Sequence, residues 1–498
     1  MKLNDLCSWA LSQEGWAEDI EKISRSLVIR DFPAIISLPL DLNNLKPDWS
    51  KLLLIASILA KSDERIHLEK ALLIAQAGIL ISDNVLVSNS SVIVLNQLFN
   101  HRTVSDAVKK GLIPQGYLSN LGVSARILAF REEIESKVFS ATTEPITANK
   151  FQIDFWSSVE KNDWVYALAP TASGKSFIVL KHILEQIALK KSRVVVYIAP
   201  TRALVSEIEQ NFRNISISQG LNISVSSVPV KDLIDAGAPC IYVFTQERLH
   251  IFLNTLTSTF AIDTLVVDEV QKLSDGMRGV ILQDAIERVF RLNNDVKILF
   301  LSPNAQNPEY LFRDKPQTVK SKIIDRDQPM VSQNIIWATQ RGPESFNWKL
   351  ELNVDDTISF LGDFDLPDRP TSIAKKMALV AFVLGAKSTG NMVYANEPSE
   401  AEDIAEFIAE LMNQSPSEEL KSLSDLARDG IHRNFKLVNT VKSGVAFHYG
   451  NMPSLLREEI ERLFNKGEIR FLVCTSTLIE GVNLSCKTIF IHGPKKGR

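Results

Sequence analysis

The first 145 residues carry the hydrophobic spacing of helices rather than of strands. Apolar residues dominate Leu52–Leu59 and Ala71–Ile81, and the charged segment Lys61–Lys70 separates the two stretches. Two apolar stretches joined by a polar connection are typical of an antiparallel helix pair. The pattern predicts an all-α N-terminal domain at residues 1–145. A structural role and a docking surface for a partner are both open for this domain.

From Phe151 onward, short apolar runs rich in β-branched residues alternate with amphipathic segments. Runs that are apolar on both faces are typical of strands in a parallel sheet whose two faces are covered by helices. These runs therefore predict a parallel sheet in a first α/β domain at residues 146–335. The predicted strands are Val165–Ala169, Val194–Ala199, Ile241–Thr245, Thr264–Val267 and Ile298–Leu301.

A second α/β series follows and predicts a second domain at residues 336–498. Between the two series, residues 341–370 carry Pro, Gly and Asp, and Trp348–Leu352 alternates, so a linker and a small β insertion are both open there. The chain ends directly after a strand, where a covering helix is usual, so we expect this second domain to be incomplete. Its predicted strands are Asn391–Ala395, Val445–His448, Arg470–Cys474 and Thr488–Ile491.

Composition and charge describe an ordinary globular chain. Its 498 residues have a formal net charge of −4 and a pI of about 6.1, so nucleic acid would have to be bound in a local groove. The four widely spaced cysteines Cys7, Cys240, Cys474 and Cys486 indicate free thiols in a reducing compartment. Met1–Ala10 has no signal-peptide pattern and no apolar run reaches about 18 residues. We therefore expect a cytoplasmic protein without a membrane partner.

A phosphate-binding loop is indicated between the first strand and the first helix of the first α/β domain. Backbone N–H groups of such a loop surround phosphates, Lys175 is expected to reach the β- and γ-phosphates of ATP, and Ser176 is expected to bind Mg²⁺. Ala169 replaces the first glycine of the common pattern, and an ordinary turn is the alternative. The loop consists of Ala169, Pro170, Thr171, Ala172, Ser173, Gly174, Lys175 and Ser176.

Two adjacent carboxylates end the apolar run that begins at Thr264. Asp268 is expected to hold Mg²⁺ and Glu269 to act as the general base that activates water. A strand that ends in Asp-Glu is a weak signal by itself. Asp268 follows Lys175 by 93 residues (268 minus 175), which leaves room for the strands of one α/β domain. Together the two motifs predict an ATP site.

The content and order of these motifs resemble the DExD/H-box helicases of superfamily 2, over about residues 151–498. Gln152 stands 23 residues before Lys175 (175 minus 152), where the family has a glutamine that reads adenine. The segments 200–204 and 245–249 resemble motifs that grip a nucleic-acid backbone, which implies phosphate contacts by Thr201, Arg202 and Thr245. The resemblance also implies two tandem RecA-like domains, with ATP and Mg²⁺ as cofactors.

Residues 444–484 are similar to the Superkiller-like branch, whose members move 3′ to 5′. The resemblance implies a single strand or a 3′-overhang duplex as substrate, with DNA favoured over RNA. It further implies backbone contacts by Thr475, Ser476 and Thr477, and positions near the nucleotide for Gly481 and Asn483.

Three features depart from the family pattern. Gln271 replaces the usual His or Asp, and Pro303-Asn304 replaces Ala-Thr, so the coupling between ATP hydrolysis and domain movement is in doubt. Gln271 is nevertheless counted among the catalytic residues. The family's final motif, with paired arginines that reach the γ-phosphate, would lie beyond Arg498. We therefore expect this chain to bind ATP but to hydrolyse it weakly or not at all.

A narrower resemblance concerns the spelling of two segments, 169–176 and 491–498. Both are similar to bacterial anti-phage helicases of the Hachiman type, in which the helicase is paired with a nuclease-like effector. The leading hypothesis is an ATP-dependent helicase or translocase. The alternative is a switch that binds ATP and nucleic acid and gates an effector nuclease. An inactive, truncated product is a third possibility.

Overall fold

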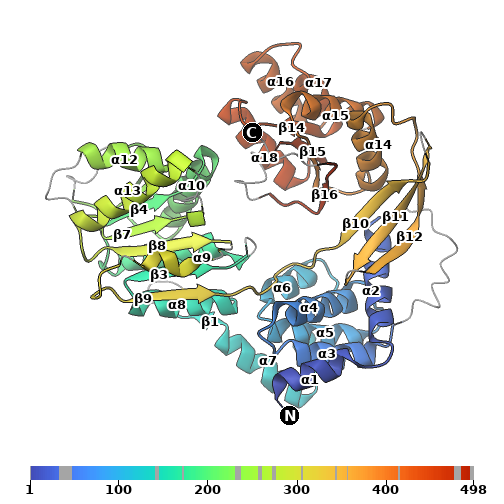
Figure 1. Ribbon diagram of the computed structural model, residues 1–498, viewed down its shortest axis with the longest axis horizontal. Coiled ribbons are helices and arrows are strands. Elements are labelled where there is room, and N and C mark those ends of the chain that lie inside the picture. The colour runs from blue at the N-terminus through green and yellow to red at the C-terminus, as the bar shows by residue number, and fades with distance from the viewer. Residues whose placement is uncertain are drawn as a thin grey trace. The chain divides into compact units, whose positions relative to one another are not determined.

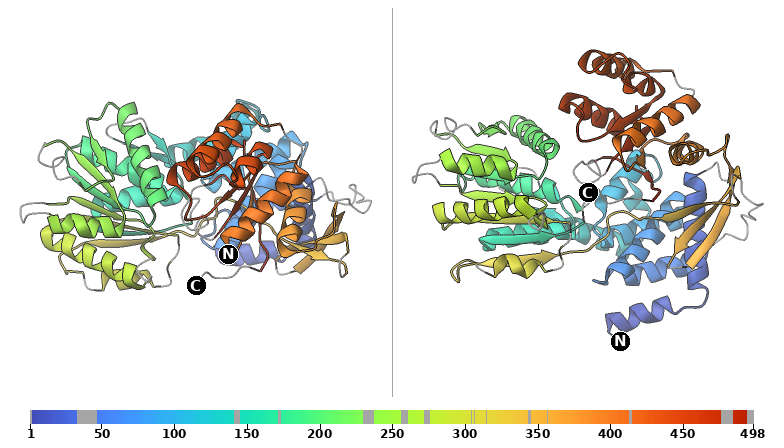
Figure 2. Two further views of the ribbon diagram at one scale, coloured as in Figure 1. Left: turned by 90° about the horizontal axis from the view of Figure 1, so that it is seen from above. Right: turned by 45° about the horizontal axis from the view of Figure 1, so that its top comes forward.

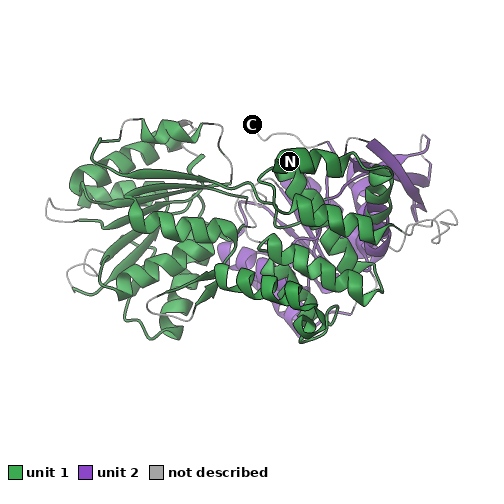
Figure 3. Cartoon of the chain, turned by 90° about the horizontal axis from the view of Figure 1, so that it is seen from below, with its two compact units in different colours: residues 1–23, 47–333 green, residues 24–46, 334–498 purple. Residues whose placement is uncertain are grey.

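The computed structural model divides the chain into two compact units (Figure 3). Unit 1 comprises residues 1–23 and 47–333, and unit 2 comprises residues 24–46 and 334–498. None of the described helices is long and apolar enough to cross a membrane. The structure describes residues 2–32, 47–140, 145–170, 173–229, 237–255, 261–271, 276–303, 305, 307–313, 315–342, 345–355, 357–412, 415–475 and 484–493.

The N-terminal part of unit 1 is helical, as the hydrophobic spacing predicts. The expected helix pair is present as α3 (Trp49–Leu59) and α4 (Arg65–Leu80), although α4 begins inside the segment that was expected to separate the two helices. The side chain of Asp48 caps α3 by accepting a hydrogen bond from the backbone N–H of Lys51, at 3.1 Å. The other helices are α1 (Leu3–Leu11), α2 (Trp16–Asp31), α5 (Val85–Gln97), α6 (His101–Lys109), η1 (Tyr117–Asn120) and α7 (Val123–Glu135).

The rest of unit 1 is built around a parallel seven-stranded sheet (Figure 1). Its strands lie in the order β5-β6-β4-β7-β8-β3-β9. Its strands are β3 (Trp164–Leu168), β4 (Val194–Ile198), β5 (Ser224–Ser226), β6 (Cys240–Phe244), β7 (Thr264–Val267), β8 (Lys297–Ser302) and β9 (Ser321–Asp325). The helices are α8 (Lys150–Lys161), α9 (Lys175–Ala188), α10 (Arg202–Ser218), α12 (Gln246–Thr255), α13 (Gly276–Leu292) and η4 (Pro308–Phe312). A small ribbon, β1 (Lys137–Val138) with β2 (Ile146–Thr147), precedes α8.

Helices cover both faces of this sheet (Figure 2), so its central strands are apolar throughout. In β3, Val165 and Ala167 share a core with α8, α9 and α10, whereas Trp164, Tyr166 and Leu168 share a core with α12 and α13. This arrangement confirms the predicted doubly wound architecture, and each predicted strand lies within one residue of the observed one at both ends.

A second parallel sheet, in the order β14-β15-β13-β16, forms the core of unit 2. Its strands are β13 (Asn391–Tyr394), β14 (Val445–His448), β15 (Phe471–Cys474) and β16 (Thr488–Phe490). The helices are α14 (Ile373–Gly385), α15 (Pro398–Leu411), α16 (Glu418–Gly430), α17 (Leu437–Thr440), η5 (Val441–Ser443) and α18 (Ser454–Lys466). The four predicted strands of the second α/β series are all present, and they are parallel.

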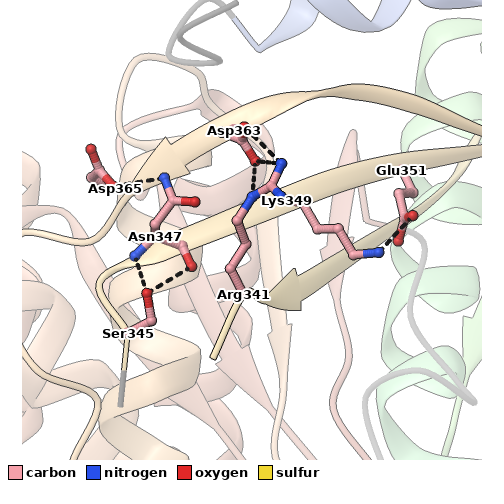
Figure 4. A network of polar contacts seen from close by, with 7 residues as sticks. All are labelled: Arg341, Ser345, Asn347, Lys349, Glu351, Asp363 and Asp365. Atoms are coloured by element: carbon pink, nitrogen blue, oxygen red, sulfur yellow. Dashed lines mark hydrogen bonds and ion pairs between the residues drawn. The ribbon is translucent and has the colours of Figure 1, made fainter. Parts of the chain in front are cut away.

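An antiparallel sheet precedes this core, in the segment for which a linker and a small β insertion were both open. It consists of β10 (Ile335–Gln340), β11 (Asn347–Val354) and β12 (Thr357–Asp365), and it begins before the expected residue 341. Alternate residues of β11 join the hydrophobic core of unit 2. The other face carries a polar network (Figure 4), in which Arg341 binds both carboxylate oxygens of Asp363 and Lys349 contacts Glu351 at 2.8 Å.

Candidate nucleotide and nucleic-acid site

The predicted phosphate loop lies between the end of β3 and the start of α9. Gly174 precedes the first residue of α9 and has a φ of +75°, a conformation that favours glycine. A Cβ atom at Gly174 would also lie 2.5 Å from Nε2 of Gln152. Backbone N–H groups at a helix N-terminus bind phosphate readily. The local geometry therefore explains why glycine precedes Lys175.

Lys175 is buried at the start of α9, and its ammonium group is held by the loop that precedes it. Nζ donates hydrogen bonds to the carbonyl oxygens of Ala169, at 2.5 Å, and Pro170, at 3.0 Å. Burial lowers the pKa of Lys175, and the carboxylates of Asp268 and Glu269 partly offset this effect. The structure thus brings the predicted loop lysine and the predicted carboxylate pair into one electrostatic site.

Gln152 lies against this loop and is almost fully buried. Its Nε2 donates to the carbonyl oxygens of Ser173, at 3.2 Å, and Gly174, at 3.3 Å, and its Oε1 accepts from the backbone N–H of Asn149, at 3.1 Å. Both ends of the side-chain amide are therefore engaged with protein groups. In this arrangement Gln152 supports the loop, and the reading of adenine stays a prediction.

Asp268 follows the last residue of β7 and is held in place by two donors. The hydroxyl of Tyr197 donates to Oδ2 at 2.8 Å, and the backbone N–H of Glu269 donates to Oδ1 at 2.9 Å. Burial raises the pKa of Asp268 to about 6, the charge of Glu269 adds to this effect, and the hydrogen bond from Tyr197 opposes it. Tyr197 was not among the predicted site residues, and its only signal was a hydroxyl within the apolar strand β4.

The donor set of Asp268 and Ser176 is compatible with Mg²⁺. The hydroxyl of Tyr197 donates to Asp268, and the side chain of Ser176 lies near enough to Tyr197 to lower its pKa, so one tyrosine lies near both predicted ligands. Both ligands offer oxygen, which Mg²⁺ prefers, and Mg²⁺ usually takes one or two protein groups together with phosphates and water. Among the described residues no cluster of three or more His, Cys, Asp or Glu side chains could hold a metal. Phosphate oxygens and water would supply the other ligands of a Mg²⁺ ion held by these two groups.

Glu269 and Gln271 form a second part of the site. Glu269 has a φ of +53°, which is uncommon for a residue other than glycine and is frequent at functional sites. The Nε2 of Gln271 donates to the carboxylate of Glu269, and the Oε1 of Gln271 accepts from Oγ of Ser302, at 2.7 Å. Gln271 therefore joins the predicted general base to the end of β8, although it differs from the residue that is usual in the family.

One pocket of about 520 Å³ brings together the residues of this domain that are predicted to contact a nucleic-acid backbone. Thr201 and Arg202 follow β4, and Thr245 follows the neighbouring strand β6. Thr201 caps α10 by accepting from the backbone N–H of Leu204, and α12 begins directly after Thr245. Two helix N-termini therefore lie at the pocket, and helix N-termini attract phosphate. The lining residues are Pro200, Thr201, Arg202, Thr245, Glu247, Arg248 and Ile251.

Arg248 lies in the segment 245–249, but it was not among the residues predicted to contact a nucleic-acid backbone. Its guanidinium donates to the carbonyl oxygen of Ser227 at 2.8 Å, which positions a second cation beside Arg202 in the lining. Thr475 is buried after the end of β15 in unit 2. The predicted residues Thr171, Ala172, Ser476, Thr477, Gly481 and Asn483 lie outside the described residues, as does Asn304.

Comparisons with known proteins agree with this arrangement of motifs. A model of the DEAD/DEAH box helicase family matches residues 149–309, and a model of the helicase conserved C-terminal domain matches residues 420–498. The ATP-dependent DNA helicase Hel308 of Pyrococcus horikoshii is 27% identical over 348 residues, which cover 68% of this chain and 44% of that protein. The human "Helicase POLQ-like" is 23% identical over 352 residues, which cover 67% of this chain and 31% of that protein.

A solved structure of the Mycobacterium smegmatis helicase Lhr bound to ssDNA and AMP-PNP is similar as well. Its TM-score is 0.45 at 21% identity, and the similarity covers 67% of this chain and 40% of that one. The chain spans less than half the length of the curated relatives and of the solved structure named here.

Proposed function

We infer that this chain, which carries the paired domains of a superfamily 2 helicase, is an ATP-driven motor that acts on nucleic acid. The order of the motifs along one edge of the first parallel sheet carries this conclusion. Neighbouring strands β6, β4, β7, β8 and β3 end in turn at Thr245, Thr201, Asp268, Ser302 and the phosphate loop. Ligands of open α/β sheets bind beyond the carboxyl ends of the strands. The proposed backbone-gripping pocket and the proposed nucleotide site therefore lie beyond neighbouring strands of one edge.

The side chains at the nucleotide half have the chemistry of phosphoryl transfer. Lys175 would leave the carbonyl oxygens of its loop to neutralise the β- and γ-phosphates of ATP. Glu269 would orient the attacking water and accept its proton. A bound Mg²⁺, held by Ser176 and Asp268, supplies charge neutralisation at the phosphate oxygens. Gly481 and Asn483 are proposed to complete the nucleotide site from the second domain.

Gln271 connects the nucleotide site to the end of β8, so it offers a path by which a bound nucleotide could shift Ser302. Its amide contacts the general base Glu269 on one side and Ser302, at the end of β8, on the other. A change in what Glu269 binds would therefore be felt at Ser302 through a single side chain. The unusual glutamine keeps a physical connection that the motif comparison had placed in doubt.

The proposed substrate is DNA, as a single strand or a duplex with a 3′ overhang. The relative from Pyrococcus horikoshii described above supports this choice, because it is named a DNA helicase. The chain has a net charge of −4, so binding must come from local contacts such as Arg202 and Arg248. Thr475, Ser476 and Thr477 are proposed to add contacts from the second domain. Such contacts are independent of base sequence and sensitive to salt.

Binding to labelled single-stranded DNA and RNA of one sequence tests this substrate assignment. We expect DNA to bind more tightly, and Arg202→Ala to weaken binding uniformly across sequences and to reduce the salt dependence by about one unit of slope. Arg213→Ala is a matched control, because Arg213 also lies on α10 but is no part of the pocket lining. Tighter binding to RNA, or an Arg202→Ala variant that binds like the parent, would contradict the assignment.

A switch that gates an effector nuclease is the second candidate, and the replacement of His or Asp by Gln271 favours it. The narrower resemblance to Hachiman-type helicases supports a role in anti-phage defence with such a nuclease as partner. Gln271→His separates the two functions. For a motor, we expect the variant to retain strand displacement, because histidine is usual there. For a switch, neither form displaces strands, and DNA binding alone releases nuclease activity from the partner.

A further inference from the structure

The helix α7, labelled in Figure 1, presents four large apolar side chains to solvent. Val123, Ile127 and Ile134 are each 64% exposed, and Phe130 is 53% exposed. A surface helix normally turns its apolar stripe toward the core. Contiguous exposed apolar side chains on a soluble domain usually mark an interaction site.

The opposite face of α7 is buried. The helix is therefore packed against its domain, and the exposure of its apolar residues does not come from loose attachment. Ala129 and Glu132 lie on the opposite side, are 6% and 7% exposed, and face the helical domain. The helix thus buries a small residue and a carboxyl group, buries Leu128 in part, and leaves four of its five large apolar residues exposed. Such an inversion needs a second surface that covers the stripe.

The spacing of the stripe indicates what kind of surface fits it. The four residues follow one another at intervals of four, three and four, which is the spacing of the a and d positions in a two-heptad coiled coil. With Val123 and Phe130 at d and Ile127 and Ile134 at a, the seam is continuous along the whole helix. The matching occupant is another helix with the same spacing.

The charges beside the seam indicate which helix this is. In the same heptad frame, Arg126 and Glu133 fall at g, and Ser124 and Arg131 fall at e. A parallel pair of α7 helices would place Arg126 of one copy against Arg131 of the other, which repels. An antiparallel pair centred between residues 128 and 129 places Arg126 against Glu133 of the other copy, twice by symmetry.

We propose that α7 is a dimerisation helix, which packs against α7 of a second copy of this chain, antiparallel and about a two-fold axis. Val123 then meets Ile134 of the second copy, and Ile127 meets its Phe130. In a single copy, Glu133 forms an ion pair with Lys137 at 3.1 Å on an exposed surface. Exposed ion pairs contribute little, so replacing Lys137 by Arg126 of the second copy costs little. Two heptads form a small interface, so the expected dissociation constant is micromolar or weaker. This dimer is independent of the ATP and nucleic-acid sites.

Sedimentation equilibrium of the 498-residue chain, over roughly 1 to 200 micromolar, tests the proposal. We expect a reversible monomer–dimer equilibrium that Phe130→Glu abolishes. Ile217→Glu is the matched control, because Ile217 is 79% exposed on α10 and lies outside the stripe. Melting temperatures should be unchanged in both variants, since both side chains are exposed. If Phe130→Glu loses the dimer and also melts at a lower temperature, misfolding explains the loss. The charge exchange described below then tests the dimer instead.

A charge exchange tests the antiparallel register separately. Arg126→Glu and Glu133→Arg should each weaken the dimer roughly ten-fold, because each turns two attractive pairs into repulsive ones. The double variant Arg126→Glu/Glu133→Arg should restore the parent affinity. Restoration supports the proposal and its absence overturns it. A chain that stays monomeric throughout the concentration range also overturns it, and leaves the stripe to a helix of a different protein. Lys175→Ala should dimerise like the parent, so failure of the proposed motor function would leave this result unaffected.

Discussion

At the residue scale, Tyr197 is the side chain that most changes the picture of the nucleotide site. From a fully buried position in β4, its hydroxyl donates to the predicted Mg²⁺ ligand Asp268, and it lies near the second predicted ligand, Ser176. Groups that orient metal ligands often change metal affinity by 10- to 100-fold when they are removed. Tyr197 is therefore a positioning residue by its contacts.

The first prediction concerns this hydroxyl. Tyr197→Phe should raise the Mg²⁺ concentration needed for half-maximal binding of an ATP analogue roughly ten-fold, because Asp268 loses its side-chain donor. A titration of Mg²⁺ at constant fluorescent nucleotide measures this change. Tyr242→Phe is the control, since Tyr242 is an equally buried tyrosine in the neighbouring strand β6. Equal Mg²⁺ dependence in both variants would show that the contact to Asp268 has no positioning role.

A second prediction at this scale concerns the buried carboxyl group of Glu132. Burial raises its pKa to about 7, Glu135 adds to this effect, and Arg131 partly opposes it. In the unfolded chain its pKa is about 4.3, so the folded state binds an extra proton between these values and loses stability as the pH rises through this window.

Glu132→Gln removes this pH-dependent loss. We expect the variant to be more stable than the parent by about 1–2 kcal/mol at about pH 8, and to show no gain near pH 4.5. Thermal unfolding at the two pH values measures the difference, and Glu18→Gln, at an exposed carboxyl group on α2, is the control. A gain of the same size at both pH values would exclude titration of Glu132 as the cause.

Motif residues have a signal in the sequence, whereas the residues that contact them have little. Lys175, Asp268 and Glu269 were predicted because a spacing and a residue type together define each of them. Tyr197 and Arg248 were missed, because a hydroxyl in an apolar strand and a second arginine in a helix have no local signature. The role of Gln152 depended on the family alone, and the structure adds contacts to the loop that no spacing indicates.

At the element scale, hydrogen bonds join the N-terminal helical domain to the segment that follows β9, the last strand of the first sheet. After β9, Gln328 donates to the carbonyl oxygen of Leu98, and the side chain of Asn100 donates to the carbonyl oxygen of Met330 at 3.1 Å. Arg65 adds an exposed bidentate contact to Asp327, at 2.9 and 3.0 Å. The chain therefore leaves the ATP-binding domain along the helices of its own N-terminal part.

The third prediction ranks these contacts by burial. Gln328→Ala should destabilise the segment by about 1–2 kcal/mol, because it leaves a buried carbonyl group without its donor. Arg65→Ala should cost less than about 1 kcal/mol, because exposed ion pairs contribute little. Hydrogen exchange of residues 326–333 measures both effects. Faster exchange in Arg65→Ala than in Gln328→Ala would contradict this ranking.

Elements were predictable where burial is two-sided and less so elsewhere. The strands of both parallel sheets stood out as apolar runs. The edge strands β5 and β9 were missed, because β5 has three residues and β9 keeps polar residues on its exposed side. The sheet of β10 to β12 was left between two alternatives, since only β11 shows clear alternation, with Trp348, Leu350 and Leu352 buried.

At the scale of the whole molecule, two units carry the two matched helicase domains. The DEAD/DEAH box match lies within unit 1, and the C-terminal helicase match lies within unit 2. Tandem order was predictable because each α/β series has its own strands. The antiparallel sheet and the exposed stripe of α7 belong to neither match, so the family resemblance was silent about them.

ATP hydrolysis by the purified chain, with and without single-stranded DNA, tests the central claim most directly. Because hydrolysis by this chain is expected to be weak, the account predicts a low turnover that DNA stimulates and that Lys175→Ala and Glu269→Gln abolish, with ATP-analogue binding weakened only by Lys175→Ala. Removing the lysine takes away a phosphate ligand, whereas removing the base leaves the binding groups in place. Turnover no higher than that of Lys175→Ala, with or without DNA, would contradict the motor and leave the switch as the better function.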